Sequence, residues 1–268
     1  MRTIDQWQKA ILPGLRQCKF MPPQVGNTTL LAYFFWDDER IDTQFYAIEC
    51  SYLCAFYRFG LLPSVLVANR ATRLIEKFCE TYGVKLDLEP RLSGGGIRGM
   101  SYDCIKNLHR RFDTDYVLII QTDGVPVNGG LDRFIGRYDY VGAPFGFHTS
   151  WRRRLPYAKY RVGNGGFSLR SKKICERAAL LYGRYFPLIP YNWFMVEDIF
   201  YSCTLRCLFP AYRAEFAFPE PEIAGTFSVE SNPAFLHDDL PPVGFHAECG
   251  FQIYKKKYGV PFSEMLLE

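Results

Sequence analysis

The sequence lacks the long hydrophobic runs that mark membrane-spanning helices and secretory signal peptides. No segment of the 268 residues approaches about 20 consecutive apolar residues. The amino-terminal stretch MRTIDQWQKAILPGLRQCKF also holds no apolar run long enough for a signal peptide. We therefore expect a protein without a transmembrane segment that works in the cytoplasm.

The sequence also has little net charge and no paired-cysteine motif. The net charge is +4, whereas nucleic-acid-binding domains usually carry a concentrated basic patch, so we expect no nucleic acid partner. The nine cysteines include no C-x-x-C pair, which argues against a zinc knuckle. We expect free, buried thiols in a reducing compartment.

What the sequence does contain is ordinary globular composition, 48% hydrophobic and 22% charged. Its first half alternates strand-like apolar runs with segments of helical periodicity. Strands are predicted at 28–36, 63–70, 84–90 and 115–123, and helices at 44–60, 73–83 and, after a glycine-rich loop, within 93–112. This alternation predicts an α/β fold with a mostly parallel central sheet flanked by helices.

The second half changes character, but no linker separates the two halves. Helices are predicted at 172–186 and 196–209, and the tail from about Ala214 is expected to form loops with short strands. We expect one domain of residues 1–268. Ligands of such sheets bind beyond the carboxyl ends of the strands.

One acid stands where the strand at 115–123 ends, in the sequence QTDG. Asp123 precedes Gly124, which we expect to let the chain turn sharply. A carboxylate in this position can bind Mg²⁺ or Mn²⁺, which in turn holds a diphosphate, or it can simply begin a turn. The nearby DTD at 113–115 fits a D-x-D pattern but precedes the strand, so we interpret it as a strand-entry feature.

Two later segments carry further candidates, VGNGGFSLRS at 162–171 and FMVEDIFYS at 194–202. Gly165 and Gly166 let backbone approach a ligand and Asn164 offers an amide to hydroxyls, although a tight turn would need glycine too. Glu197 and Asp198 open an apolar helix. They suit the helix dipole, and a carboxylate there can also act as a general base.

Two weaker signals complete the set. His246, in PPVGFHAECGF, is one of only four histidines; it is either a ligand or a structural hydrogen-bonding group, and a second GFH ending at His148 weakens the signal. The run at 151–161 holds Arg152, Arg153, Arg154 and Lys159 between aromatic residues. Such a run is usually a solvated face, but it can also cover a diphosphate.

In this order, QTDG, YDYVGAP, VGNGGFSLRS, EDIFYS and GFH resemble a family of GT-A-fold glycosyltransferase-like proteins once catalogued as a domain of unknown function. The resemblance covers about residues 30–251. It implies a GT-A-like, Rossmann-type fold, with a nucleotide-sugar-binding lobe at about 28–125 and an acceptor-binding and catalytic lobe at about 126–268. It also implies Mn²⁺ or Mg²⁺ as cofactor.

The resemblance also implies roles for single residues. Asp123 and His246 would bind the metal, Asp198 would be the base, and Glu197 would bind sugar hydroxyls. The residues expected to contact donor or acceptor are Phe34, Asn69, Arg70, Gln121, Thr122, Asn164, Gly165 and Gly166. One departure is that Gln121 stands in place of the first acid of the usual D-x-D, so the metal motif has one acid fewer.

The predicted function is therefore transfer of a hexosyl or pentosyl group from a nucleotide sugar, first of all a UDP-sugar, to a glycan or glycolipid hydroxyl, with inversion, in polysaccharide or glycan biosynthesis. One alternative is a non-catalytic protein that binds nucleotide sugars or glycans. The other is a nucleotidyltransferase, although the segment FFWDDERIDTQF after the first strand lacks the glycine-rich phosphate loop expected of that class.

Overall fold

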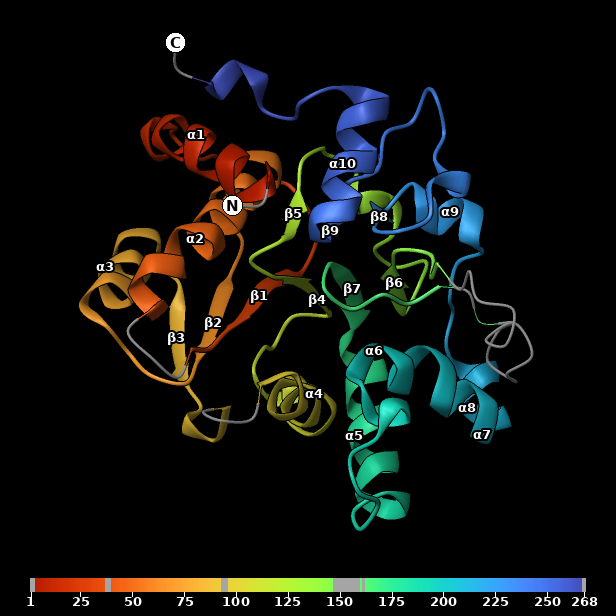
Figure 1. Ribbon diagram of the computed structural model, residues 1–268. Coiled ribbons are helices and arrows are strands. Elements are labelled where there is room, and N and C mark those ends of the chain that lie inside the picture. The colour runs from red at the N-terminus through yellow and green to blue at the C-terminus, as the bar shows by residue number, and fades with distance from the viewer. Residues whose placement is uncertain (1–2, 37–39, 93–95, 147–159, 161, 267–268) are drawn as a thin grey trace.

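A computed structural model describes residues 3–36, 40–92, 96–146, 160 and 162–266 of the chain. A six-stranded sheet forms its centre (Figure 1). The strands are β1 (Thr28–Phe34), β2 (Ser64–Ala68), β3 (Lys85–Leu88), β4 (Tyr116–Ile120), β6 (Tyr140–Gly142) and β7 (Ser168–Ser171). They are arranged in the order β3-β2-β1-β4-β7-β6.

The first four strands of the sheet run parallel. β1 pairs in parallel with β2 and with β4, and β2 pairs in parallel with β3. β7 is antiparallel to β4, and β6 is antiparallel to β7. All seven residues of β1 are buried, as expected of a strand that is covered on both faces. The predicted α/β fold with a mostly parallel central sheet is confirmed.

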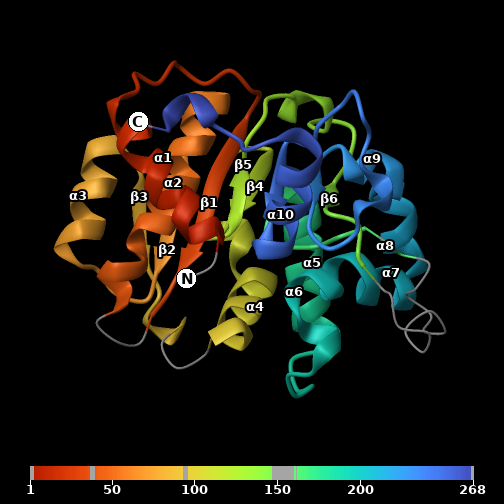
Figure 2. The ribbon, with the colours of Figure 1, turned by 45° about the horizontal axis from the view of Figure 1, so that its top comes forward.

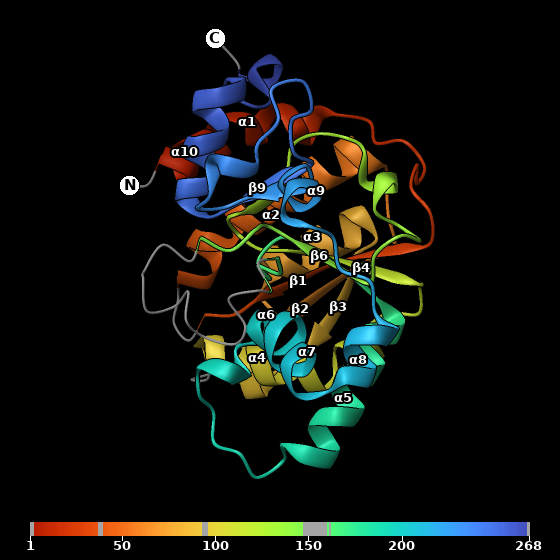
Figure 3. The same ribbon diagram turned by 90° about the vertical axis from the view of Figure 1, so that its right-hand side faces the viewer.

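Helices cover both faces of this sheet. Their bounds are α1 (Thr3–Gln17), α2 (Arg40–Phe59), α3 (Arg73–Tyr82), α4 (Gly96–Lys106), α5 (Lys172–Tyr185), α6 (Glu197–Ile199), α7 (Leu205–Leu208), α8 (Pro210–Glu215), α9 (Pro221–Gly225) and α10 (Ala247–Tyr258). Figure 3 shows α1, α2 and α10 on one side of the sheet and α4, α5 and α7 on the other. Alternate residues of β1 therefore enter two separate cores, with Leu30 in one and Leu31 in the other.

A second, three-stranded sheet joins the end of β4 to the tail of the chain. It contains β5 (Gly124–Pro126), β8 (Ser228–Val229) and β9 (Gly244–His246), in the order β5-β9-β8. β9 is antiparallel to β5, and Gly124 lies opposite His246. This pairing brings His246 next to Asp123, although 122 residues separate them in the sequence.

Helices at both ends of the chain were not predicted from the sequence. α1 buries Ile4, Trp7, Ile11 and Leu15 at helical spacing, a pattern that was available in the sequence. The Trp7 indole Nε1 donates to the Pro261 carbonyl oxygen at 2.8 Å, so the C-terminal segment returns to α1 (Figure 2). The tail does contain the expected short strands, but α9 and α10 correct the prediction that it would otherwise form loops.

The helix predicted at 196–209 is also interrupted. α6 leads into a π-helical turn at Phe200–Thr204, and α7 follows. All five residues of this turn are buried, so the segment has no solvent-facing side such as an ordinary amphipathic helix has. π-helical turns occur frequently at functional sites.

Within the residues that the structure describes, no helix combines the length and the apolar character that crossing a bilayer requires.

Candidate functional site

The turn that follows β4 is held by three hydrogen bonds to its backbone carbonyl groups. The Ser51 hydroxyl donates to the Gln121 carbonyl oxygen at 2.9 Å, and Gln8 Nε2 donates to that of Thr122 at 2.6 Å. The Ala247 amide donates to the Asp123 carbonyl oxygen at 2.9 Å. Helices α1, α2 and α10 therefore fix the turn together, and Asp123 lies beyond the carboxyl end of β4.

His246 lies between acids on both sides of its ring. Its Nε2 is 3.6 Å from Asp123 Oδ1 and 3.3 Å from Gln121 Oε1, while its Nδ1 is 3.2 Å from Glu230 Oε1. Burial lowers the pKa of His246, but the hydrogen bond with Glu230 and the charge of Asp123 outweigh burial, so the pKa is raised. Glu230 was not predicted from the sequence, because it lies sixteen positions before His246.

The glycine-rich loop passes between His246 and the acid pair of α6. A Cβ atom on Gly165 would lie 2.1 Å from Glu197 Oε1, and one on Gly166 would lie 2.0 Å from His246 Nε2. Neither position has room for a larger residue. Two consecutive residues thus bring the two candidate centres to one place in the molecule.

Two smaller features of the site differ from expectation, one in the glycine-rich loop and one in the turn after β4. Asn164 is buried, and its Oδ1 accepts from the Gly166 amide at 3.2 Å, so this amide group stabilises its own loop. Gly124 does not have the positive φ of a tight turn. It is required instead because a Cβ there would lie 2.2 Å from the Gly166 carbonyl oxygen.

Glu197 forms a buried ion pair with Arg170. The side-chain atoms Arg170 Nη2 and Glu197 Oε1 are 2.9 Å apart, and Arg170 is fully buried. The guanidinium lies 4.9 Å from the ring centroids of both Tyr140 and Tyr201, close enough for cation–π attraction. Arg170 belongs to the SLRS segment, but its role was not predicted. The alternating pattern of a strand does not show which partner a buried arginine contacts.

Asp198 has no such arginine partner in the hydrogen bonds that the structure shows. Its Oδ1 accepts from the Ile199 amide at 2.6 Å. Burial first, and then the charge of Glu197, raise the pKa of Asp198 to about 8. A carboxyl group whose pKa lies near neutrality can both accept and release a proton under working conditions.

The residues predicted to contact the nucleotide lie at the carboxyl ends of β1 and β2. Phe34 is only 1% exposed and packs on Phe45 with ring centroids 5.6 Å apart, so it offers no ring face to a ligand in this structure. The Asn69 amide bonds to both backbone groups of Trp36, at 3.0 and 3.3 Å. Arg70 is exposed.

The remaining sequence candidates are the acids of DTD, the second GFH and the basic run at 151–161. Asp113 and Asp115 lie before β4, and Asp115 Oδ2 accepts from Asn27 Nδ2 at 3.0 Å, so the interpretation of DTD as a strand-entry feature agrees with the structure. His148, Arg152, Arg153, Arg154 and Lys159 lie outside the described residues.

A metal ion would find only part of its ligand set in the protein. Across the described parts of the chain, no group of three or more His, Cys, Asp and Glu side chains is placed to hold one. The Asp123 carboxylate and His246 Nε2 nevertheless offer two ligands, and Glu230 holds the other ring nitrogen as metal-binding histidines require. This set fits a cation that takes its other ligands from substrate phosphates and water.

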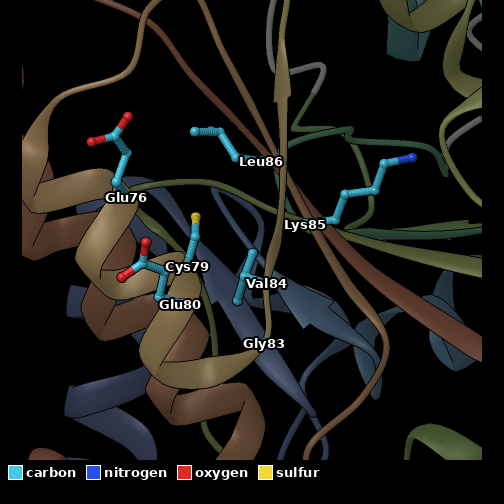
Figure 4. A pocket seen from close by; sticks show the side chains of 7 residues that line it. All are labelled: Glu76, Cys79, Glu80, Gly83, Val84, Lys85 and Leu86. Carbon is cyan, nitrogen blue, oxygen red and sulfur yellow. The ribbon is translucent and has the colours of Figure 1, made fainter.

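A separate hollow of about 400 Å³ lies between α3 and β3, at the edge of the sheet. In Figure 4, Leu86 points toward α3 and Lys85 points away from it. The residues that line it are Glu76, Cys79, Glu80, Gly83, Val84, Lys85 and Leu86. None of them belongs to the site around Gly165 and Gly166.

The fold and the site define a mixed α/β protein whose acids and histidine converge beyond the carboxyl end of a central strand. A family profile described as "Protein of unknown function (DUF5672)" matches residues 102–246, more than half of the chain, and the protein belongs to this family. No curated protein matches the sequence.

Solved structures of three transferases are similar to this chain. The mannosyltransferase Ktr4p from S. cerevisiae, in complex with GDP, has a TM-score of 0.44 at 8% identity, over 84% of this chain and 78% of that one. The apo-form glycosyltransferase GlyE from Streptococcus pneumoniae has 0.43 at 13%, over 83% and 54%. The mannosyltransferase PcManGT from Pyrobaculum calidifontis, in complex with GDP-Man and Mn²⁺, has 0.34 at 12%, over 65% and 58%. The chain thus spans little more than half of the last two.

Proposed function

We propose that the protein is a glycosyltransferase that moves a sugar from a nucleotide-sugar donor to an acceptor hydroxyl with inversion. The observation that carries the proposal is the position of Gly165 and Gly166, which lie against Glu197 on one side and His246 on the other. Donor activation and proton removal are two different tasks. In this arrangement, the residues proposed for the two tasks lie against two consecutive residues of one loop.

The donor end of the site consists of Asp123, His246 and Gln121. Asp123 and His246 would hold Mn²⁺ or Mg²⁺, and such an ion neutralises charge that develops on a diphosphate leaving group. Glu230 orients His246 through Nδ1, so that Nε2 faces Asp123. The Gln121 side chain reaches the same nitrogen and completes the polar wall of this end.

The acceptor end of the site consists of the two acids of α6. Arg170 forms an ion pair with Glu197 and fixes its position, and burial, followed by the charge of Glu197, raises the pKa of Asp198. Asp198 is the proposed base, which takes the proton of the acceptor hydroxyl as that oxygen attacks the anomeric carbon. A single base on the face opposite the leaving group gives inversion of configuration. Glu197 would bind sugar hydroxyls through Oε2, because the Arg170 hydrogen bond goes to Oε1.

The donor and its metal can be tested together with purified protein. A panel of nucleotide sugars, with UDP-sugars first and GDP-sugars next, should raise the unfolding temperature more strongly with Mn²⁺ than without it. Released nucleoside diphosphate, measured by chromatography, then identifies the donor that is turned over. A panel that leaves the unfolding temperature unchanged contradicts donor binding.

Asp123→Ala sharpens that test. We expect the calorimetric donor affinity in Mn²⁺ to fall at least about tenfold, since loss of a residue that merely orients a metal ligand already costs about 10–100-fold. Asp113→Ala is the matched control, because Asp113 is fully exposed and belongs to the DTD sequence that precedes β4. Equal affinities for both variants would remove Asp123 from the site. Donor binding without any turnover would instead favour a non-catalytic sugar-binding protein.

A further inference from the structure

An apolar hollow is lined in part by the segment that leads into the acid pair of α6. It has a volume of about 500 Å³, within the range of small-molecule sites. Its apolar lining consists of Phe186, Ile189, Phe194, Met195, Cys207 and Leu208. Met195 precedes Glu197 by two residues, so the wall of this hollow continues into α6.

The chemistry of the lining favours hydrocarbon over sugar. The two polar side chains in the wall already bond to the backbone of the same loop. Asn192 Oδ1 accepts from the Phe194 amide at 2.9 Å, and the Thr204 hydroxyl donates to the Phe194 carbonyl oxygen at 3.0 Å. A ligand with many hydroxyls would lose water here without gaining partners, whereas an alkyl chain would gain apolar contact.

The loop at 186–195, which forms one wall of the hollow, extends the apolar surface outward. Figure 3 shows this loop beyond the end of α5, at the lower extremity of the molecule. Leu188 is 94% exposed, and Ile189 and Phe194 are 39% and 43% exposed. No charged residue occurs from Tyr185 to Val196. Exposed apolar residues that are grouped in one uncharged loop are typical of an interaction site.

Positive charges surround this apolar loop. The Arg98 guanidinium lies 5.8 Å from the ring of Tyr191 in the loop, and Lys106 Nζ lies 4.9 Å from the ring of Tyr182 in α5. Arg184, also exposed, ends α5 just before the loop. Apolar residues at a tip with cations behind them complement an anionic lipid surface, where hydrocarbon lies beneath negative headgroups.

We propose that loop 186–195 and the hollow behind it bind the hydrocarbon part of a lipid-linked acceptor at an anionic membrane surface, with the acceptor hydroxyl directed toward Asp198. This inference rests on the proposed glycosyl transfer and names its acceptor class.

The test is co-sedimentation with vesicles of phosphatidylcholine, with and without phosphatidylglycerol. The protein should bind the anionic vesicles, and salt should weaken that binding. Leu188→Asp and Leu208→Asp should each lower vesicle affinity at least about tenfold, since every buried methylene is worth about 0.8 kcal/mol. Leu74→Asp is the matched control, because Leu74 is 40% exposed on the distant α3.

The outcomes separate this inference from the proposed function, because the donor-dependent shift in unfolding temperature is measured on the same variants. All three variants should retain that shift, which also shows that they fold. A protein that responds to donor but ignores vesicles, or that loses equal affinity through Leu74→Asp, overturns the lipid assignment alone. If the protein forms dimers that Leu188→Asp disrupts, and does not bind vesicles, the lipid assignment is wrong and the loop is a self-association surface. Vesicle binding without any donor response overturns the proposed transfer and, with it, the acceptor role of the lipid.

Discussion

Two buried arginines each pair with acids in this protein, but the pKa of a neighbouring carboxyl group is lowered in one cluster and raised in the other. Arg111 contacts Asp87 at 2.6 Å, Asp103 at 2.5 Å and Glu89 at 3.4 Å, and Arg91 adds a second cation on Glu89. Arg170 contacts Glu197 at 2.9 Å, and Asp198 follows it in the chain.

The difference appears in the pKa values of the carboxyl groups. The hydrogen bond from Arg91 is the main cause that lowers the pKa of Glu89 to about 2, whereas burial and the neighbouring Glu197 raise the pKa of Asp198 to about 8. The Arg111 cluster ties β3 to α4 through ion pairs with Asp87 and Asp103, so we interpret it as structural. Arg170 pairs with Glu197, whereas the pKa of Asp198 lies near neutrality, which suits the proposed base.

Asp198→Asn should have the largest effect. We expect the transfer rate to fall about 10²–10⁴-fold, the usual contribution of a general base, while donor affinity persists. In the natural protein, kcat should rise with pH until about 8, where Asp198 becomes ionised, and the Asn variant should lose this rise. Near-natural rates from Asp198→Asn, measured by product formation, would remove Asp198 from the chemistry.

Arg111→Met should have the next largest effect, on stability. It would leave three carboxylates without their shared cation in a site where Arg111 is 7% exposed, and breaking a buried pair costs about 3–5 kcal/mol of unfolding free energy. Urea unfolding measures the loss. Arg110→Met, at an exposed neighbour, is the control and should change stability little. Equal stability of both variants would mean that Arg111 is not structural.

Glu230→Gln tests an acid that is held by a histidine rather than by an arginine. The Gln variant should bind Mn²⁺ about 10–100-fold more weakly, because Glu230 orients His246 through Nδ1. Titration calorimetry in the presence of donor measures this change. Glu222→Gln, at an exposed acid, should retain the natural affinity. If the two variants bind Mn²⁺ equally well, His246 does not contact the metal.

The smallest expected effect is a pH-dependent difference in stability between Glu89→Gln and Asp198→Asn. Because the folded-state pKa of Glu89 is lowered from 4.5 to about 2, Glu89 adds stability above pH 4.5 that is lost toward pH 2. The folded-state pKa of Asp198 is raised from 3.8 to about 8, so natural stability falls as pH rises through this window.

Glu89→Gln should therefore cost about 1 kcal/mol near neutral pH and nothing near pH 2, since its partner Arg91 is 81% exposed and screened by water. Asp198→Asn should instead gain about 0.5–2 kcal/mol at pH 8 and nothing below pH 4. Thermal unfolding at several pH values measures both. Changes of the same sign would contradict the contrast between the two clusters.

Local sequence patterns were sufficient to predict the strands and helices between residues 28 and 120. The run at 64–68 and the amphipathic segment at 73–82 both formed as expected, because a period of two or of 3.6 is set by neighbouring residues. The place of Asp123 followed from the rule that sites collect at the carboxyl ends of parallel strands. The acids of α6 were also predicted at the helix start where the structure has them.

The partners of these residues could not be predicted in the same way. Arg170 meets Glu197 across 27 residues, and Gln8 reaches Thr122 across 114. Such contacts depend on how whole elements pack, and on the direction that each side chain takes. The repeating apolar pattern of α1 was visible, but Pro13, a residue that ordinarily interrupts helices, lies inside it, and the pattern did not predict a helix that supports the site.

The distribution of the sheet over the chain has a practical consequence for work on the family. The shared segment 102–246 includes β4, β6 and β7, but β1, with which β4 pairs from Tyr116 to Ile120, lies upstream of it. Expressed alone, that segment would present an apolar, unpaired strand edge and would be prone to aggregate. It would also lose Gln8 and Ser51, which hold the turn bearing Asp123. Truncated proteins should therefore retain the first hundred residues.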